Sequence, residues 1–222
     1  MEFETFKSWL DYALQRVEQI YYGRDWWQEM RYIPPDYINM EHYLQTNGER
    51  GFCYELYHYM RVAMHWHRNN KSHLYENHFN RIFLNAELSK RKILDAHRAF
   101  FEERGIERLD KNYFPDFLFH SPSDTDYQIV VMEVKSNPEL QATDIISDLR
   151  KLRQFVAKYN YQYGIFLAIN ISPVIIQEEF IRHEIINFLQ EIPNEDKERI
   201  FLMIKENSKS PVFEKKLSEL IY

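Results

Sequence analysis

The segment Ile129-Val130-Val131-Met132-Glu133-Val134-Lys135 is an apolar run that ends in two opposite charges. Its Val and Ile residues favour a β-strand. Side chains alternate between the two faces of a strand, so Glu133 and Lys135 share one face and Val134 lies on the other. The segment therefore predicts ionisable side chains at the end of a strand where packing alone would favour apolar ones.

A further carboxylate, that of Asp116, precedes the partner strand. Residues 114–120 are typical of a strand entered through Pro115, and a Ser/Pro/Asp turn joins them to a strand over residues 127–135. Such a hairpin brings Asp116 near Glu133, so that two carboxylates face one space. Carboxylates in contact repel and must take up protons or bind a cation, and oxygen ligands suit Mg²⁺ or Mn²⁺. An adjacent lysine can orient or deprotonate the attacking water. The two carboxylates and the lysine together therefore suit phosphodiester hydrolysis.

The rest of the chain alternates between helical and strand-like segments. Apolar residues at helical spacing predict helices over residues 3–22, 49–68, 89–104, 138–159 and 173–190. Strands are predicted over residues 81–88, 163–171 and 199–204, and a polar helix is predicted at the C-terminus. Residues 25–47 are aromatic and irregular, and they read as a packed connection.

Pro115-Asp116, followed seventeen positions later by Glu133-Val134-Lys135, resembles the motif of the PD-(D/E)XK restriction-endonuclease-like nuclease superfamily. The resemblance implies an α/β fold with an αβββαβ core and a mixed central sheet flanked by helices, here over residues 49–171. It implies a helical, aromatic-rich N-terminal extension at residues 1–48 and a nuclease-like domain at residues 49–222.

The resemblance also implies a role for each site residue. Asp116 and Glu133 would bind the metal, Mg²⁺ or Mn²⁺, together with the carbonyl of Val134. Lys135 would be the water-positioning base. Glu55, on the apolar face of the helix over residues 49–68, would match the glutamate that many members place beside the metals.

Other interpretations of these residues stay open. Asp116, Glu133 and Lys135 could form an exposed salt bridge at the hairpin end. Glu55 could lie at the edge of the apolar stripe of its helix, or pair with Arg61 or with a tyrosine. A zinc site finds little support, because no HExxH or Cys/His ligand pattern accompanies the histidines.

The amino-acid composition limits which cellular compartment and which binding partners are expected for the protein. The chain has 222 residues, 45% of them hydrophobic and 16% aromatic, which predicts a globular protein with a substantial core. The single cysteine, Cys53, cannot form an intramolecular disulfide, and the N-terminus lacks the features of a secretory signal, so a cytoplasmic location is expected. No apolar run is long enough to span a membrane. The net charge of −6 gives no global attraction to nucleic acid.

The resemblance implies an Mg²⁺-dependent endonuclease that cleaves DNA, with RNA as the alternative substrate, in a defence, repair or mobile-element setting. Many such nucleases act as dimers, so a homodimer formed through the N-terminal extension is a further expectation. The alternative is a nuclease-fold subunit that binds nucleic acid or protein and has lost efficient chemistry. The intact Asp116, Glu133 and Lys135 favour the enzyme, whereas the negative charge and the aromatic extension favour the alternative.

Overall fold

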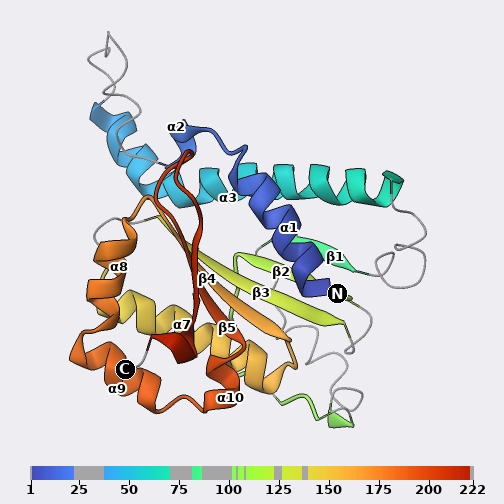
Figure 1. Cartoon of the computed structure of the whole chain (residues 1–222), viewed down its shortest axis with the longest axis vertical. Coiled ribbons are helices and arrows are strands. Elements are labelled where there is room, and N and C mark those ends of the chain that lie inside the picture. The colour runs from blue at the N-terminus through green and yellow to red at the C-terminus, as the bar shows by residue number, and fades with distance from the viewer. Residues whose placement is uncertain are drawn as a thin grey trace.

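In the part of the chain that the structure describes, six β-strands form one mixed sheet, shown in Figure 1 as a computed structural model. The structure describes residues 2–22, 38–70, 82–86, 102–103, 105–107, 109–122, 127–136 and 140–220. In spatial order the strands are β1 (Phe83–Ala86), β2 (Phe117–His120), β3 (Gln128–Lys135), β4 (Tyr163–Ile169), β5 (Ile200–Lys205) and β6 (Phe213–Lys216). Neighbouring strands are antiparallel except for β3–β4 and β4–β5, which are parallel. The predicted α/β class and the hairpin of β2 and β3 are confirmed.

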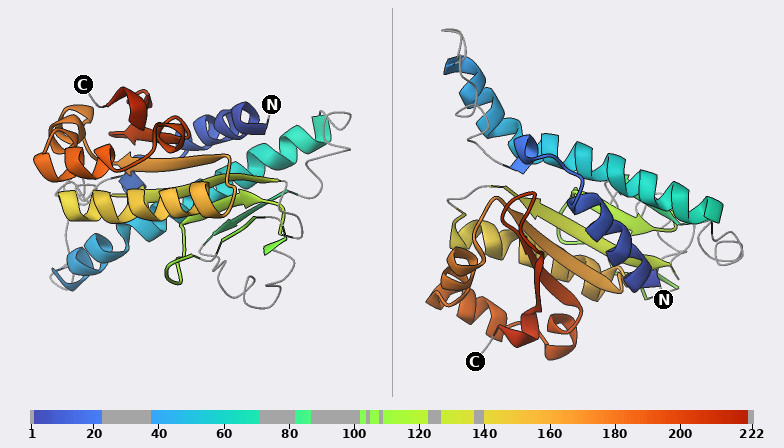
Figure 2. Two further views of the ribbon diagram at one scale, coloured as in Figure 1. Left: turned by 90° about the horizontal axis from the view of Figure 1, so that it is seen from below. Right: turned by 45° about the horizontal axis from the view of Figure 1, so that its top comes forward.

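Helices cover both faces of the sheet, as Figure 2 shows. One layer contains α1 (Glu2–Leu14), α2 (Gln19–Tyr22) and α3 (Ile38–Asn70). The other contains α7 (Ala142–Lys158), α8 (Pro173–Phe180), α9 (His183–Gln190) and α10 (Asn194–Lys197). Among the helices of the described ranges, none is both long and apolar enough to cross a lipid bilayer, and this includes the 33-residue α3.

The alternation of side chains along β3 separates two apolar cores. Val130, Met132 and Val134 are buried with α1 and α3, whereas Val131 is buried with α7 to α9. Every residue of β3 except Lys135 is buried. Because both faces of the strand are covered, the face that carries Val131 also buries Glu133, a carboxylate.

Helix α7 connects β3 to the parallel strand β4 and lies close against the sheet. Its buried residues recur at helical spacing, as predicted, and include Ile145, Leu149, Leu152 and Val156. A Cβ atom at Gly164 in β4 would lie 3.3 Å from Ile200 Cγ1 and 3.4 Å from Leu152 Cβ. The absence of a side chain at Gly164 therefore permits the close approach that fixes α7 over β3 and β4.

Several predicted boundaries are wrong. Helix α3 begins at Ile38, so residues 38–47 are helical and not an irregular connection. The helix predicted over residues 173–190 is two helices, α8 and α9, which are separated at Ile181 and Arg182. The basic helix predicted over residues 89–104 and the connection at residues 25–37 fall almost wholly outside the described residues.

The predicted polar helix at the C-terminus is also wrong. This segment instead forms β6, followed by the short 3₁₀ turn η4 (Leu217–Glu219). Strand β5 is buried along its whole length, and β6 pairs with it over Phe201 to Ile204. The pairing satisfies backbone groups of β5 that an open edge would leave exposed, and such a distant constraint outweighs the local helical preference.

We expect Gly164→Val to destabilise the fold by about 1–3 kcal/mol, because the added methyl groups would push Ile200 and Leu152 apart. The matched control is Gly51→Ala in α3, whose new Cβ would lie 3.8 Å from Tyr21 Cδ1 and should leave stability unchanged or raise it slightly. Urea unfolding monitored by circular dichroism measures both. Equal midpoints for wild type and Gly164→Val would contradict the close approach of α7.

Candidate functional site

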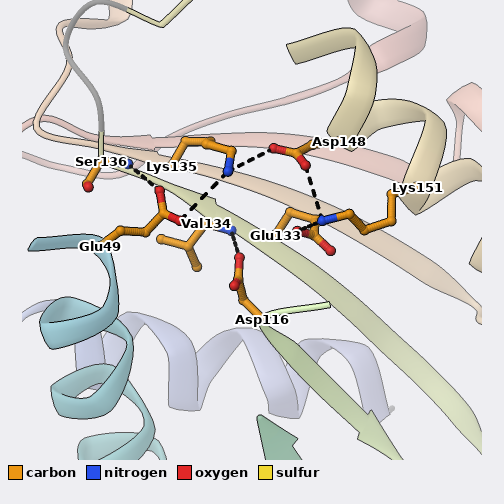
Figure 3. A network of polar contacts seen from close by, with 8 residues as sticks. All are labelled: Glu49, Asp116, Glu133, Val134, Lys135, Ser136, Asp148 and Lys151. Atoms are coloured by element: carbon orange, nitrogen blue, oxygen red, sulfur yellow. Dashed lines mark hydrogen bonds and ion pairs between the residues drawn. The ribbon is translucent and has the colours of Figure 1, made fainter. Parts of the chain in front are cut away.

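Charged side chains from four elements converge at the carboxyl end of β3, as Figure 3 shows. Glu133 and Lys135 project from β3 itself, and Asp116 lies just before β2. Asp148 and Lys151 come from α7, on the face of the sheet that Glu133 shares. Glu49 reaches the same place from α3.

The carboxylate of Asp116 lies beside the backbone of Val134. The N–H of Val134 donates to Asp116 Oδ2 at 2.7 Å. Phe117 pairs with Met132, so continuing this register by two residues places Pro115 opposite Val134. Proline has no N–H to donate, so the ladder ends there. Since the N–H and C=O of one strand residue point to the same neighbour, the Val134 carbonyl lies on the side of Asp116.

Glu133 is a buried carboxylate with a second carboxylate nearby. Its side chain is 2% exposed. Burial, and then the charge of Asp116, raises the pKa of Glu133 well above its usual value, although the ammonium of Lys151 opposes this. Burial raises the pKa of Asp116 to about 6; the Val134 N–H opposes the shift and Glu49 adds to it. The charge of Asp116 therefore acts on Glu133, in agreement with the proximity that the hairpin predicts.

Two lysines compensate these charges. Lys135 Nζ lies 3.3 Å from Asp148 Oδ2 and 3.7 Å from Glu49 Oε1. Lys151 Nζ contacts Glu133 Oε2 and lies 3.2 Å from Asp148 Oδ1. Burial lowers the pKa of each lysine, but the surrounding carboxylates outweigh it, so both pKa values are raised. Both ammonium groups therefore stay charged at neutral pH.

The helix glutamate at this site is Glu49. Its Oε2 accepts the Ser136 N–H at 3.2 Å, next to Lys135. Glu55 lies six positions further along α3, which turns it by about 240° around the helix. It hydrogen-bonds with Tyr21 and, after burial, helps to raise the pKa of that hydroxyl. The structure thus brings together Asp116, Glu133, Val134 and Lys135, and pairs Glu55 with a tyrosine.

Sequence reasoning missed three members of the network: Glu49, Asp148 and Lys151. A signal existed for Asp148, which falls between Ile145 and Leu152 on the buried stripe of α7, where an apolar residue is expected. Lys151 follows three positions later, within reach on the same helix. No local signal marks Glu49, because its direction depends on how α3 packs against the sheet.

The network holds an excess of carboxylate oxygens, which are the donor atoms that a hard divalent cation prefers. When ionised, the four carboxylates outnumber the two ammonium groups and leave two negative charges in excess. Glu133 Oε1 is buried and has no hydrogen-bond partner among the described residues. The described ranges contain no group of three or more His, Cys, Asp or Glu side chains arranged to hold a metal. Two carboxylates with one carbonyl are, however, a typical protein contribution to Mg²⁺, which keeps several waters.

The fold and the site together define an α/β protein with a partly buried cluster of carboxylates and lysines at the end of its central strand. Comparison of the chain with family models, with curated proteins and with solved structures gives no match. The function must therefore be inferred from the geometry of the site.

We expect Asp116 to contribute to the pH dependence of stability, together with Glu133, whose pKa is also raised. The Asp116 pKa of about 6 in the folded protein exceeds the value near 3.9 of an unfolded carboxyl. The folded state then binds more protons, so metal-free stability falls as the pH rises from about 4 to above 6. Asp116→Asn still accepts the Val134 N–H but cannot ionise, so it should gain up to about 3 kcal/mol relative to wild type across that range.

Urea midpoints measured between pH 4 and 7 in a chelating buffer test this expectation. The matched control is Asp110→Asn, which removes a largely exposed carboxylate that pairs with Lys158. It should follow the wild-type pH profile. If the profiles of Asp116→Asn and wild type run parallel, Asp116 does not contribute to the pH dependence.

Proposed function

We propose that this chain is an Mg²⁺-dependent nuclease of the restriction-endonuclease-like class, which hydrolyses phosphodiester bonds in DNA. One observation carries the proposal. The carboxylate of Asp116 accepts the Val134 N–H and lies near enough to Glu133 to help raise its pKa, with Lys135 next along the strand. Packing alone does not favour two repelling carboxylates in a buried place.

The order of elements supports the proposal. Helix α3 precedes the antiparallel strands β1, β2 and β3, and α7 then leads to the parallel strand β4. Within the described residues, these elements are compatible with the αβββαβ order that the resemblance to the superfamily implies. On this proposal α1, β5, β6 and the helices α8 to α10 are additions to the core.

The residues divide into metal ligands and positioning groups. Asp116, Glu133 and the Val134 carbonyl would hold the ion. A bound Mg²⁺ supplies charge stabilisation on the phosphate and a water of lowered pKa. Lys135 stays charged, so it acts as a hydrogen-bond donor that orients the water or the phosphate. On this proposal the role of Lys135 changes from the expected base to a hydrogen-bond donor, because a charged ammonium has no lone pair to accept a proton.

Glu49 takes the part that the resemblance gives to a helix glutamate. It holds both the Ser136 N–H and the ammonium of Lys135. Through these two contacts it fixes the end of β3 and the direction of the lysine. Glu55 pairs with Tyr21 and has no such part in the proposal.

A second candidate is a nuclease-fold subunit that binds nucleic acid or protein without cleaving it. The ion pair of Lys151 with Glu133 favours this candidate, because it occupies one oxygen of a proposed metal ligand. The net charge of −6 also weakens general attraction to a polyanion. Measured cleavage separates the two candidates.

We expect Mg²⁺- or Mn²⁺-dependent cleavage when the chain is incubated with single-stranded, duplex and branched DNA and with RNA. Glu133→Ala and Lys135→Ala should each lower the rate by about 100-fold or more, because each removes a group that acts on the reacting phosphate. Lys158→Ala, which breaks an ion pair with Asp110 further along α7, should retain activity. Equal inertness of wild type and both site variants on every substrate would favour the binding subunit.

We expect Glu49→Gln to lower cleavage by at least about tenfold, because the neutral amide no longer pairs with Lys135. Glu55→Gln, the same change on the same helix, should retain the wild-type rate. Single-turnover rates at saturating Mg²⁺ compare the two variants. The reverse result would restore Glu55 as the helix glutamate of the site.

A further inference from the structure

We infer that Lys151 is a built-in counter-cation of this site, which a divalent ion must displace from Glu133 in order to bind. The inference rests on the proposed function, because it takes Glu133 as a metal ligand. It adds a form of regulation, since the affinity for metal then depends on a lysine outside the motif.

Because it contacts Glu133, Lys151 competes with an incoming cation for that carboxylate. Its ammonium contacts Glu133 Oε2, and the lysine is the more exposed partner, with 18% of its side chain exposed against 2% for Glu133. The ammonium therefore already occupies Oε2, an oxygen at which an arriving cation would compete with it. Two cations on one buried carboxylate repel each other strongly, because little water lies between them to screen the charges.

Asp148 is a second ion-pair partner for Lys151. Lys151 Nζ lies 3.2 Å from Asp148 Oδ1, three positions away on the same helix, while it also contacts Glu133. Rotation of the lysine side chain alone can therefore break the Glu133 contact and keep an ion pair. The exchange needs no movement of α7, whose buried residues hold it against the sheet.

The second lysine is engaged differently. Lys135 forms its ion pairs with Asp148 and Glu49, and neither of these is a proposed ligand of the ion. Asp148 therefore bridges both ammonium groups, one on each oxygen. Of the two lysines, Lys151 is the one whose ion pair involves a proposed ligand, so it sets the metal concentration at which the site is filled.

The test is the affinity of the full chain for Mn²⁺, measured by isothermal titration calorimetry without substrate. We expect Lys151→Met to bind Mn²⁺ about tenfold more tightly than wild type, because no ammonium has to be displaced. Lys158→Met is the matched control: it removes the same charge from the same helix but pairs with Asp110, so its Kd should equal that of wild type. Lys151→Arg keeps the charge and should also keep the wild-type Kd.

An equal or weaker affinity in Lys151→Met overturns the inference, as does the absence of Mn²⁺ binding in every variant. If Lys151→Met fails to fold, Lys151→Gln replaces it with the same expected shift, since its amide can donate to Glu133 without a charge. The readout is independent of cleavage. Tighter Mn²⁺ binding in a chain that cleaves nothing keeps the inference and removes the proposed function, whereas cleavage with an unchanged Kd removes the inference alone.

Discussion

The burial of one carboxylate, that of Glu133, is the constraint on which the site depends. A charge on one face of a central strand that is covered on both faces must be neutralised, paired or bound to a cation. The neighbouring elements supply that compensation: α7 provides Lys151, and Asp148 then shares the ammonium. Asp116 opposes this compensation, because a second carboxylate nearby makes the ionisation of Glu133 less favourable. The site is therefore defined by a charge that its own surroundings only partly balance.

The sheet keeps this balance in place. Strand β3 lies between β2 and β4, with one apolar core on each face, so the backbone that carries Glu133 and Lys135 cannot shift without disturbing both cores. The hydrogen-bonded ladder between β2 and β3 ends at Pro115. At that point the carboxylate of Asp116 accepts the Val134 N–H. Gly164 lets α7 approach closely enough for its side chains to reach Glu133. The fold thus holds the site at a point where regular pairing stops.

Local patterns predict the parts of this arrangement that depend on neighbours in sequence. The Val- and Ile-rich run before Glu133 and the hairpin that carries Asp116 follow from strand alternation and turn residues, and so does the amphipathic α7. The choice between Glu49 and Glu55 does not, because the face that α3 turns toward β3 is set by tertiary contacts. The same holds for β6, whose pairing with the buried β5 overrides a polar sequence, and for the break between α8 and α9, which lacks proline or glycine.

The number of charged side chains at the end of β3, and the excess of carboxylates among them, argue for a functional site over a purely structural salt bridge. Buried ion pairs contribute little net stability, and well-packed apolar side chains at the same positions often serve a fold as well or better. Four carboxylates and two lysines at one strand end, with one oxygen of Glu133 lacking a partner among the described residues, are a poor way to stabilise β3. They suit a place that accepts an additional positive charge. On the proposed function, a divalent cation would remove the excess, and the same cation would bring a phosphate to the lysine that stays charged beside it.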